Sequence, residues 1–481
     1  MINSKKKNEL IVIISLLFFT FFIRAYNIGY DDLWFDEISS YWVSDPKITL
    51  NENLIRHEKI EKTPFLYFLV LKYNFDIFLY NDLTGRYLSL FFNVLGIVFS
   101  ILTCKLISSN KAYIFALFMF ASNIYLINYS QELRVYSFVF FLSSLYLYLF
   151  FRIYKFFKTE NLNFFYFTLL SFSLVLMLIS HPFCYIVFFS TSVFLLMEFF
   201  FKKRISKTLK YNLVFGVIFS FIYLFFLLEK NGQSPSWILQ PDLKFYTNFY
   251  FSKFFGSRLM GLTHLILFLS LIFLIYKKDL KKNFELNILL ILVFFIYFIP
   301  IFYGYIISPI IFPRYIIFVL IPIIILLSVL IYEIENIFIR NSIITILIIL
   351  NIGNHFFEAS FQQFFKQRPF LKPNFTKMIN IIKEDDVKSY TIQLKELKDE
   401  NDNYYKAIEH YVSNLIIPQK IDIKYFEKNN FIDSNIKKIW VICLLTIVKD
   451  KCENIKLDSN NFILKEEMVP GMRMVLISKN L

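Results

Sequence analysis

The chain has 481 residues, of which 57% are hydrophobic, and its formal net charge is +14. Apolar runs of ~20 residues recur along it, the length needed to cross the ~30 Å hydrocarbon core of a bilayer. These properties indicate a polytopic membrane protein and exclude an ordinary soluble enzyme.

The positive charge is concentrated in short loops between the apolar runs, where it orients helices by the positive-inside rule. Outside these loops the sequence has no basic stripe with interleaved aromatic residues, which is the usual footprint of a nucleic-acid-binding surface. We therefore expect membrane lipids as partners and no nucleic acid.

The first apolar run begins a membrane domain that we assign to residues 1–357. Lys5, Lys6 and Lys7 precede this run and no small-residue cleavage site follows it, so we expect a retained anchor with a cytoplasmic N-terminus. The first external loop is then residues 29–85. We expect Arg24 to snorkel to the outer surface and Arg86 to anchor a helix end at headgroup level.

Residues 64–80 are apolar but contain Lys72, Asn74 and Asp76. If they crossed the membrane, the basic clusters at 202–210 and 277–282 would lie outside, against the positive-inside rule. We therefore predict an interfacial helix there. About 11 transmembrane helices remain, near residues 8–28, 86–106, 112–128, 135–156, 163–181, 183–201, 211–229, 259–276, 284–303, 315–333 and 341–357.

The odd number of spans places residues 358–481 outside the cytoplasm as a small α/β domain. Residues 388–394 and 439–446 have strand patterns, 403–415 form an amphipathic helix, and 462–464 with 472–477 form a hairpin that turns at Pro470 and Gly471. Cys443 and Cys452 share this domain, and the sequence leaves open whether they pair. The fold class is thus a polytopic all-α membrane protein with an added α/β domain, in a plasma or inner membrane.

An acidic pair, Asp36 and Glu37, lies among aromatic residues in the first external loop. An apolar setting makes a carboxylate a stronger base, so Asp36 is a candidate general base and Glu37 a candidate support. A solvated surface pair is the plainer interpretation. His57, with Glu58 and Glu61, is a weak candidate for a divalent cation, the one possible cofactor, and the sequence does not identify a metal.

Basic residues lie on the same predicted face as the acidic pair. Lys62, Arg134 and Arg314 are candidates for binding a lipid-linked phosphate, since a planar guanidinium donates paired hydrogen bonds to phosphate. Tyr136, two residues after Arg134, is a further candidate for binding this phosphate, and Glu61, Glu132, His181 and Tyr315 are possible site residues. His181 at a helix end is as well explained by a structural role as by a functional one. Trp237, in a second outer loop, is a membrane anchor or a sugar-stacking residue.

Several short motifs occur in a characteristic order. They are Leu-Trp-Phe-Asp-Glu at 33–37, Glu-Lys-Thr-Pro-Phe-Leu-Tyr at 61–67, Arg-Tyr-Leu-Ser at 86–89, Tyr-Ser-Gln-Glu-Leu-Arg-Val-Tyr at 129–136, Ser-His-Pro at 180–182 and Pro-Arg-Tyr at 313–315. In this order the chain resembles the large-loop membrane glycosyltransferases, which include protein O-mannosyltransferases, the lipid A aminoarabinose transferase and bacterial lipopolysaccharide sugar transferases. Thr63 departs from the pattern, since many relatives have a Pro-Pro pair there.

The resemblance implies transfer of a sugar from a polyprenyl-phosphate donor to a lipid, glycan or protein acceptor outside the cytoplasm, with inversion at the anomeric carbon. A polytopic transporter or flippase is the main alternative, although it would be expected to carry ionisable residues at mid-membrane. A polysaccharide polymerase or ligase of the cell envelope is a second alternative, and an inactive scaffold is a third.

Overall fold

The computed structural model describes most of the chain. The described residues are 4–61, 63–108, 110–156, 162–202, 205–230, 238, 240, 252–277, 284–357, 372–385, 387–393, 402–417, 423–425, 437–444 and 461–479. They divide into two compact units: residues 1–26, 63–67 and 86–362 form the first, and residues 27–62, 68–85 and 363–481 form the second.

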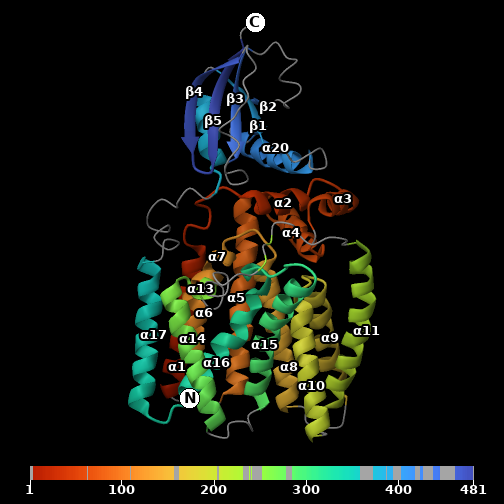
Figure 1. The fold of residues 1–481 in the computed structure, drawn as a ribbon, viewed down its shortest axis with the longest axis vertical. Coiled ribbons are helices and arrows are strands. Elements are labelled where there is room, and N and C mark those ends of the chain that lie inside the picture. Colours follow the sequence, from red (N-terminus) through yellow and green to blue (C-terminus); the bar gives the residue numbers. More distant parts are fainter. Residues whose placement is uncertain are drawn as a thin grey trace. The chain divides into compact units, whose positions relative to one another are not determined.

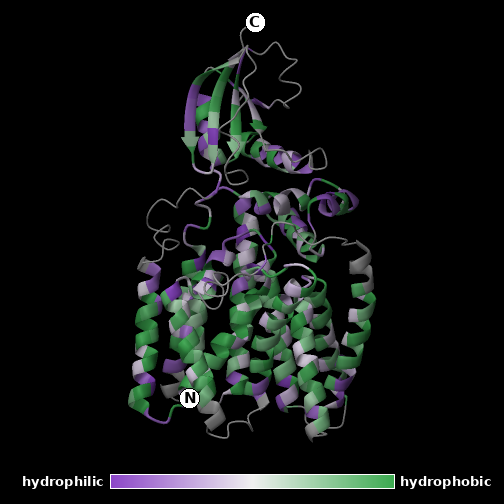
Figure 2. Cartoon of the chain, in the orientation of Figure 1, coloured by the Kyte–Doolittle hydropathy of each residue, from purple (hydrophilic) through white to green (hydrophobic). Residues whose placement is uncertain are grey.

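The first unit is a bundle of helices that run side by side (Figure 1). Its members are α1 (Ser4–Ala25), α5 (Asp82–Ile107), α6 (Ala112–Ser122), α7 (Ile124–Ser130), α8 (Tyr136–Phe156), α9 (Phe164–Leu178), α10 (Cys184–Lys202), α11 (Lys207–Lys230), α13 (Ser252–Phe255), α14 (Arg258–Lys277), α15 (Phe284–Ile306), η2 (Pro313–Val319), α16 (Leu320–Tyr332) and α17 (Ile337–Phe357). Figure 2 shows that hydrophobic residues dominate these helices. Every residue of α16 from Leu320 to Ile331 is buried, so this helix forms the centre of the core.

A helix or a broken helix covers each of the eleven predicted spans. Six helices of the described residues are long and apolar enough to cross a membrane, and α6 with α7 makes a seventh candidate that bends by 57°. Asn123 explains this bend, because its side chain accepts a hydrogen bond from the Leu126 amide and thereby caps α7 at a fresh N-terminus. The polytopic class is confirmed, and the count of eleven stays a prediction.

Arg24, near the end of α1, corrects one expectation. Its side chain is fully buried. The guanidinium donates to Asn93 Oδ1 at 2.9 Å and to the carbonyl oxygens of Thr20, Phe120 and Ala121 at 3.0–3.2 Å. The prediction that Arg24 snorkels was therefore wrong: it joins α1, α5 and α6 inside the bundle. Arg86 is also buried, with 2% exposure, so it is no headgroup anchor either.

The second unit contains helices from the first external loop: α2 (Phe35–Val43), α3 (Leu50–Ile60) and most of α4 (Leu66–Ile77). The 12 residues of α4 rise only about 18 Å, too little to cross a bilayer core. Lys72 on α4 is buried, and its ammonium donates to the carbonyl oxygens of Asp45, Pro46 and Ile48 at 3.0–3.2 Å. Lys72 therefore ties α4 to the loop between α2 and α3.

The rest of the second unit is a five-stranded sheet with two helices, α19 (Phe375–Glu384) and α20 (Asp402–Ile416). The strands are β1 (Ser389–Gln393), β2 (Lys424–Tyr425), β3 (Lys438–Leu444), β4 (Asn461–Val469) and β5 (Met472–Lys479), in the order β2-β1-β3-β5-β4. β1 pairs in parallel with β2 and β3, while β5 is antiparallel to β3 and β4.

The predicted strands, helix and hairpin of this region are confirmed. The hairpin turns at Gly471, whose φ of +70° favours glycine. The sequence analysis missed α19 and β2. Cys443 is buried in β3, and Cys452 lies outside the described residues.

Candidate active site

The acidic pair lies in the first turn of α2, in the second unit. Trp34 precedes the helix with an extended backbone, and its amide donates to Glu37 Oε2 at 3.3 Å. The Glu37 side chain is fully buried, and the Lys372 ammonium lies 3.2 Å from the same carboxylate oxygen. Glu37 therefore closes the start of α2 and forms an ion pair with a residue of the C-terminal region.

The neighbouring acids differ in their surroundings. Asp32 accepts hydrogen bonds from the amide and the hydroxyl of Thr376, at 2.7 and 2.8 Å, and so caps α19. Asp36 is partly exposed. Because Asp32 and Glu37 hold the local fold, Asp36 is the better placed of the three to meet a substrate.

The remaining loop candidates lie on or after α3. Glu61 ends this helix, and its amide donates to the His57 carbonyl at 2.8 Å. The His57 ring is buried and lies 4.9 Å from the Phe68 ring. Lys62 and Trp237 lie outside the described residues. Within the described ranges, no group of three or more His, Cys, Asp or Glu side chains is arranged to hold a metal ion.

A cationic cluster forms in the first unit, from three segments far apart in the sequence. The guanidinium carbon of Arg314 lies 5.5 Å from the centre of the Tyr136 ring, and that of Arg134 lies 6.0 Å from it. The His181 and Tyr315 rings lie 6.4 and 6.2 Å from the Tyr136 ring. The structure thus brings together five predicted residues from the α7–α8 connection, the α9–α10 turn and the start of η2.

His181 is uncharged in this cluster. Its side chain is 3% exposed, and burial, with the positive charges of Arg134 and Arg314, lowers its pKa from 6.5 to about 3. The positive charge of the cluster therefore comes from the two arginines. Two guanidinium groups and a phenolic ring at one place form a setting suited to an oxyanion.

Glu132, which was predicted, and two tyrosines that were not predicted lie next to the cluster. The backbone carbonyl of Glu132 accepts from the Arg134 amide at 2.9 Å, which turns the chain before α8. The Tyr129 ring lies 5.4 Å from that of Tyr136 and 4.7 Å from that of Tyr125. The four-residue spacing of Tyr125 and Tyr129 places both on one face of a helix, a signal the sequence analysis did not use.

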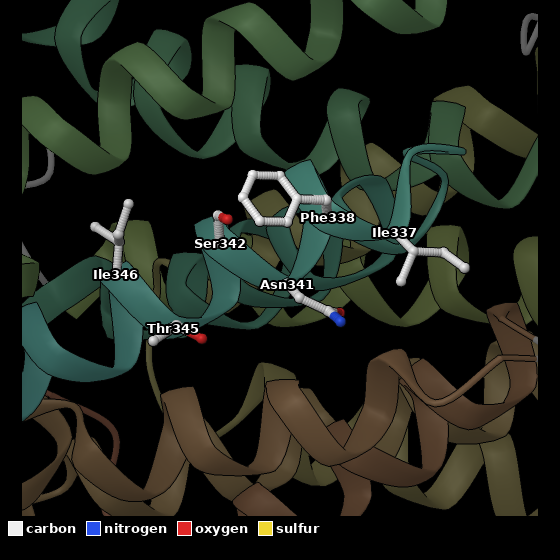
Figure 3. Close-up of a pocket in the computed structure, with 6 residues that line it drawn as sticks. All are labelled: Ile337, Phe338, Asn341, Ser342, Thr345 and Ile346. Carbon is white, nitrogen blue, oxygen red and sulfur yellow. The ribbon is translucent and has the colours of Figure 1, made fainter.

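An open pocket of about 670 Å³ lies beside α17, after the last of the motifs in the sequence (Figure 3). Both apolar and polar residues line it: Ile337, Phe338, Asn341, Ser342, Thr345 and Ile346. None of them is a predicted site residue. The pocket carries no titratable group among these residues, so we assign no catalytic role to it.

Comparison with known proteins shows the fold. No protein-family model matches the chain, and no curated protein matches it. The crystal structure of ArnT from Cupriavidus metallidurans in the apo state aligns with a TM-score of 0.59, covering 98% of both chains at 9% sequence identity. The same protein bound to undecaprenyl phosphate aligns with a TM-score of 0.57, covering 97% of both chains at 10% identity. The chain therefore has, over almost its whole length, the fold of ArnT, a lipid A aminoarabinose transferase of the type that its motifs resemble.

Proposed function

We propose that this protein is a membrane glycosyltransferase that transfers a sugar from a polyprenyl-phosphate carrier to a lipid, glycan or protein acceptor. The observation that carries the proposal is the convergence of Arg134 and Arg314 on Tyr136, beside an uncharged His181. Guanidinium groups bind phosphate strongly because their hydrogen bonds are charge-assisted and paired. The ArnT fold supports the same chemistry, since ArnT itself was solved bound to undecaprenyl phosphate.

In this reaction the acceptor hydroxyl attacks the anomeric carbon on the face opposite the phosphate. The carbon–oxygen bond to the phosphate breaks, polyprenyl phosphate leaves with the electron pair, and the configuration inverts. Asp36 accepts the hydroxyl proton. Asp36 is partly exposed in the first turn of α2, and a carboxylate side chain is a common general base.

The other predicted residues have supporting roles. Arg134, Arg314 and Lys62 bind the donor phosphate and offset the charge that develops as it leaves. Glu37 holds the turn that carries Asp36. In this proposal the N-terminus is cytoplasmic, and the loop 29–85 and the domain 358–481 lie on the extracytoplasmic face.

The test reconstitutes the purified protein in liposomes with a panel of polyprenyl-phosphate sugars and candidate acceptors. Wild type and Asp36→Asn are compared for glycosidic product, with the anomeric configuration read by NMR. Asp31→Asn is the matched control, because Asp31 is also a partly exposed acid of the same loop. We expect loss of transfer in D36N and near-normal transfer in D31N.

Two results would contradict parts of the proposal. Full transfer by D36N would show that Asp36 is not the base, and it would not contradict the roles assigned to the other residues. Movement of the carrier lipid across the liposome membrane, with no glycosidic product from any donor, would instead favour the transporter.

A further inference from the structure

The segment that bears Asp36 is held by residues from the C-terminal region of the same unit. Lys372 forms an ion pair with Glu37 at 3.2 Å, and Thr376 donates two hydrogen bonds to Asp32. The Tyr411 hydroxyl accepts from the Leu33 amide at 3.1 Å. These contacts flank Asp36 on both sides in the sequence.

Aromatic contacts add to this attachment. The Phe35 ring stacks on the Tyr404 ring with 4.6 Å between their centres. The Tyr404 hydroxyl also donates to the Ile60 carbonyl at the end of α3, at 3.4 Å. Tyr404 and Tyr411 both belong to α20, so one helix contacts the residue before Asp36 and the helix that follows α2.

The ion pair joins the start of α2 to the C-terminal region through a buried carboxylate. The Glu37 side chain has no exposure to solvent, whereas Lys372 retains 22%. A buried carboxylate that loses its cation becomes strongly unfavourable, and the surrounding structure shifts to expose or neutralise it. The oxygen that Lys372 contacts also accepts from the Trp34 amide, so such a shift would undo the cap of α2 and move the adjacent Asp36.

We propose that Lys372 is a positioning residue for the transfer reaction, and that the C-terminal region acts through it to fix the orientation of the catalytic turn. The inference rests on the proposed role of Asp36. The α/β domain then has a structural task in addition to any binding of the acceptor. Without Lys372, Asp36 would be present but misplaced.

The first arm of the test measures transfer per folded protein in liposomes. Lys372→Met is expected to lower kcat by about 10²-fold, the typical cost of misplacing a catalytic group by ~1 Å, while KM for the donor changes little. Lys372→Arg should restore most of kcat, because it keeps the charge. Lys377→Met is the matched control, since Lys377 is an exposed lysine of the same region, and it should behave as wild type.

A double variant separates positioning from direct action on the substrate. In the Glu37→Gln background the buried charge is gone, so adding Lys372→Met should cost at most about twofold more, because interacting residues give non-additive effects. An equal loss from K372M in both backgrounds would overturn the inference. A rise in donor KM with unchanged kcat would also overturn it.

The second arm needs no activity. Hydrogen exchange of the α2 amides is expected to be faster in K372M than in wild type, unchanged in K377M, and returned toward wild type in E37Q/K372M. Unchanged exchange in K372M would overturn the positioning role, whatever reaction the protein performs. By contrast, the expected exchange pattern in all three variants, together with no sugar transfer by wild type, would count against the proposed function alone.

Discussion

The guanidinium carbon of Arg314 lies 5.5 Å from the centre of the Tyr136 ring, although the two residues begin different helical segments of the bundle. Arg134 lies near the same ring, at 6.0 Å. The electron-rich face of an aromatic ring attracts cations, so Tyr136 reduces the cost of keeping two positive charges in one place. A phosphate that entered the cluster would benefit from both charges.

The first prediction concerns Arg314. The proposed function predicts that Arg314→Lys weakens the binding of a polyprenyl phosphate by about tenfold, because an ammonium lacks the planar fork that pairs with phosphate oxygens. Arg314→Met should weaken it further. Titration of the purified protein with the lipid, followed by intrinsic fluorescence, measures the change. Arg340→Met serves as the control, since Arg340 contacts Tyr332 at the C-terminal end of α16, whereas Arg314 lies before the N-terminal end of this helix. Equal affinity of R314K and wild type for the lipid would show that binding does not depend on the planar guanidinium of Arg314.

Local patterns predicted much of the structure. Hydropathy located the helices of the bundle, and the alternation around Pro470 and Gly471 located the closing hairpin. The predicted topology also placed Arg134 and Arg314 on one face of the membrane domain, but it did not predict that both would approach the Tyr136 ring.

Interactions between distant residues could not be predicted in this way. The partners of Arg24 come from positions 93, 120 and 121, and no local signal distinguishes such a residue from an arginine that reaches the membrane surface. The attachment of Lys372 to Glu37 likewise joins two ends of the chain that show no sequence pattern in common.

The second prediction concerns Arg24. Arg24→Met would leave Asn93 Oδ1 and the carbonyl oxygens of Phe120 and Ala121 buried without this donor, at a cost of about 1–3 kcal/mol for each group that finds no substitute. The variant should therefore lose thermal stability strongly in detergent, as measured by fluorescence-detected size exclusion after heating. An unchanged melting temperature would instead fit an arginine that snorkels.

The third prediction follows from His181. Its pKa falls from 6.5 to about 3 on folding, so between these two pH values the unfolded chain binds a proton that the folded protein does not. The stability contributed by this difference is complete above pH 6.5 and is lost as the pH falls toward 3. His181→Asn, which cannot titrate, should lose less stability than wild type over this range.

The measurement for His181 is the melting temperature of both proteins as a function of pH. The two curves should diverge as acid is added, with the wild type falling faster. Parallel curves would mean that His181 has a similar proton affinity in the folded and unfolded states. Other carboxylates titrate in the same range, and the comparison between variants removes their contribution.

The fourth prediction tests the turn that supports Lys372. Gly471 has a φ of +70°, and a Cβ placed there would lie 2.6 Å from the Pro373 nitrogen and 2.8 Å from the Lys372 carbonyl carbon. These are backbone atoms, which cannot swing away as a side chain would. Gly471→Ala should therefore destabilise the second unit by about 2 kcal/mol or more, through strain and the forced shift of the chain.

Gly353→Ala is the matched control for this change. Gly353 lies within α17, and apart from the adjacent residues and backbone of its own helix no atom lies within 4 Å of its Cβ position, so alanine there should stabilise the helix by about 0.5–1 kcal/mol. Because the Asn374 amide donates to the Pro470 carbonyl at 3.0 Å, the shift in G471A would reach the segment that presents Lys372 to Glu37. Faster hydrogen exchange in α2 of G471A, alongside unchanged exchange in G353A, would then tie the hairpin turn to the turn that bears Asp36. If G471A is destabilised but hydrogen exchange in α2 is unchanged, the ion pair between Lys372 and Glu37 does not depend on the hairpin turn.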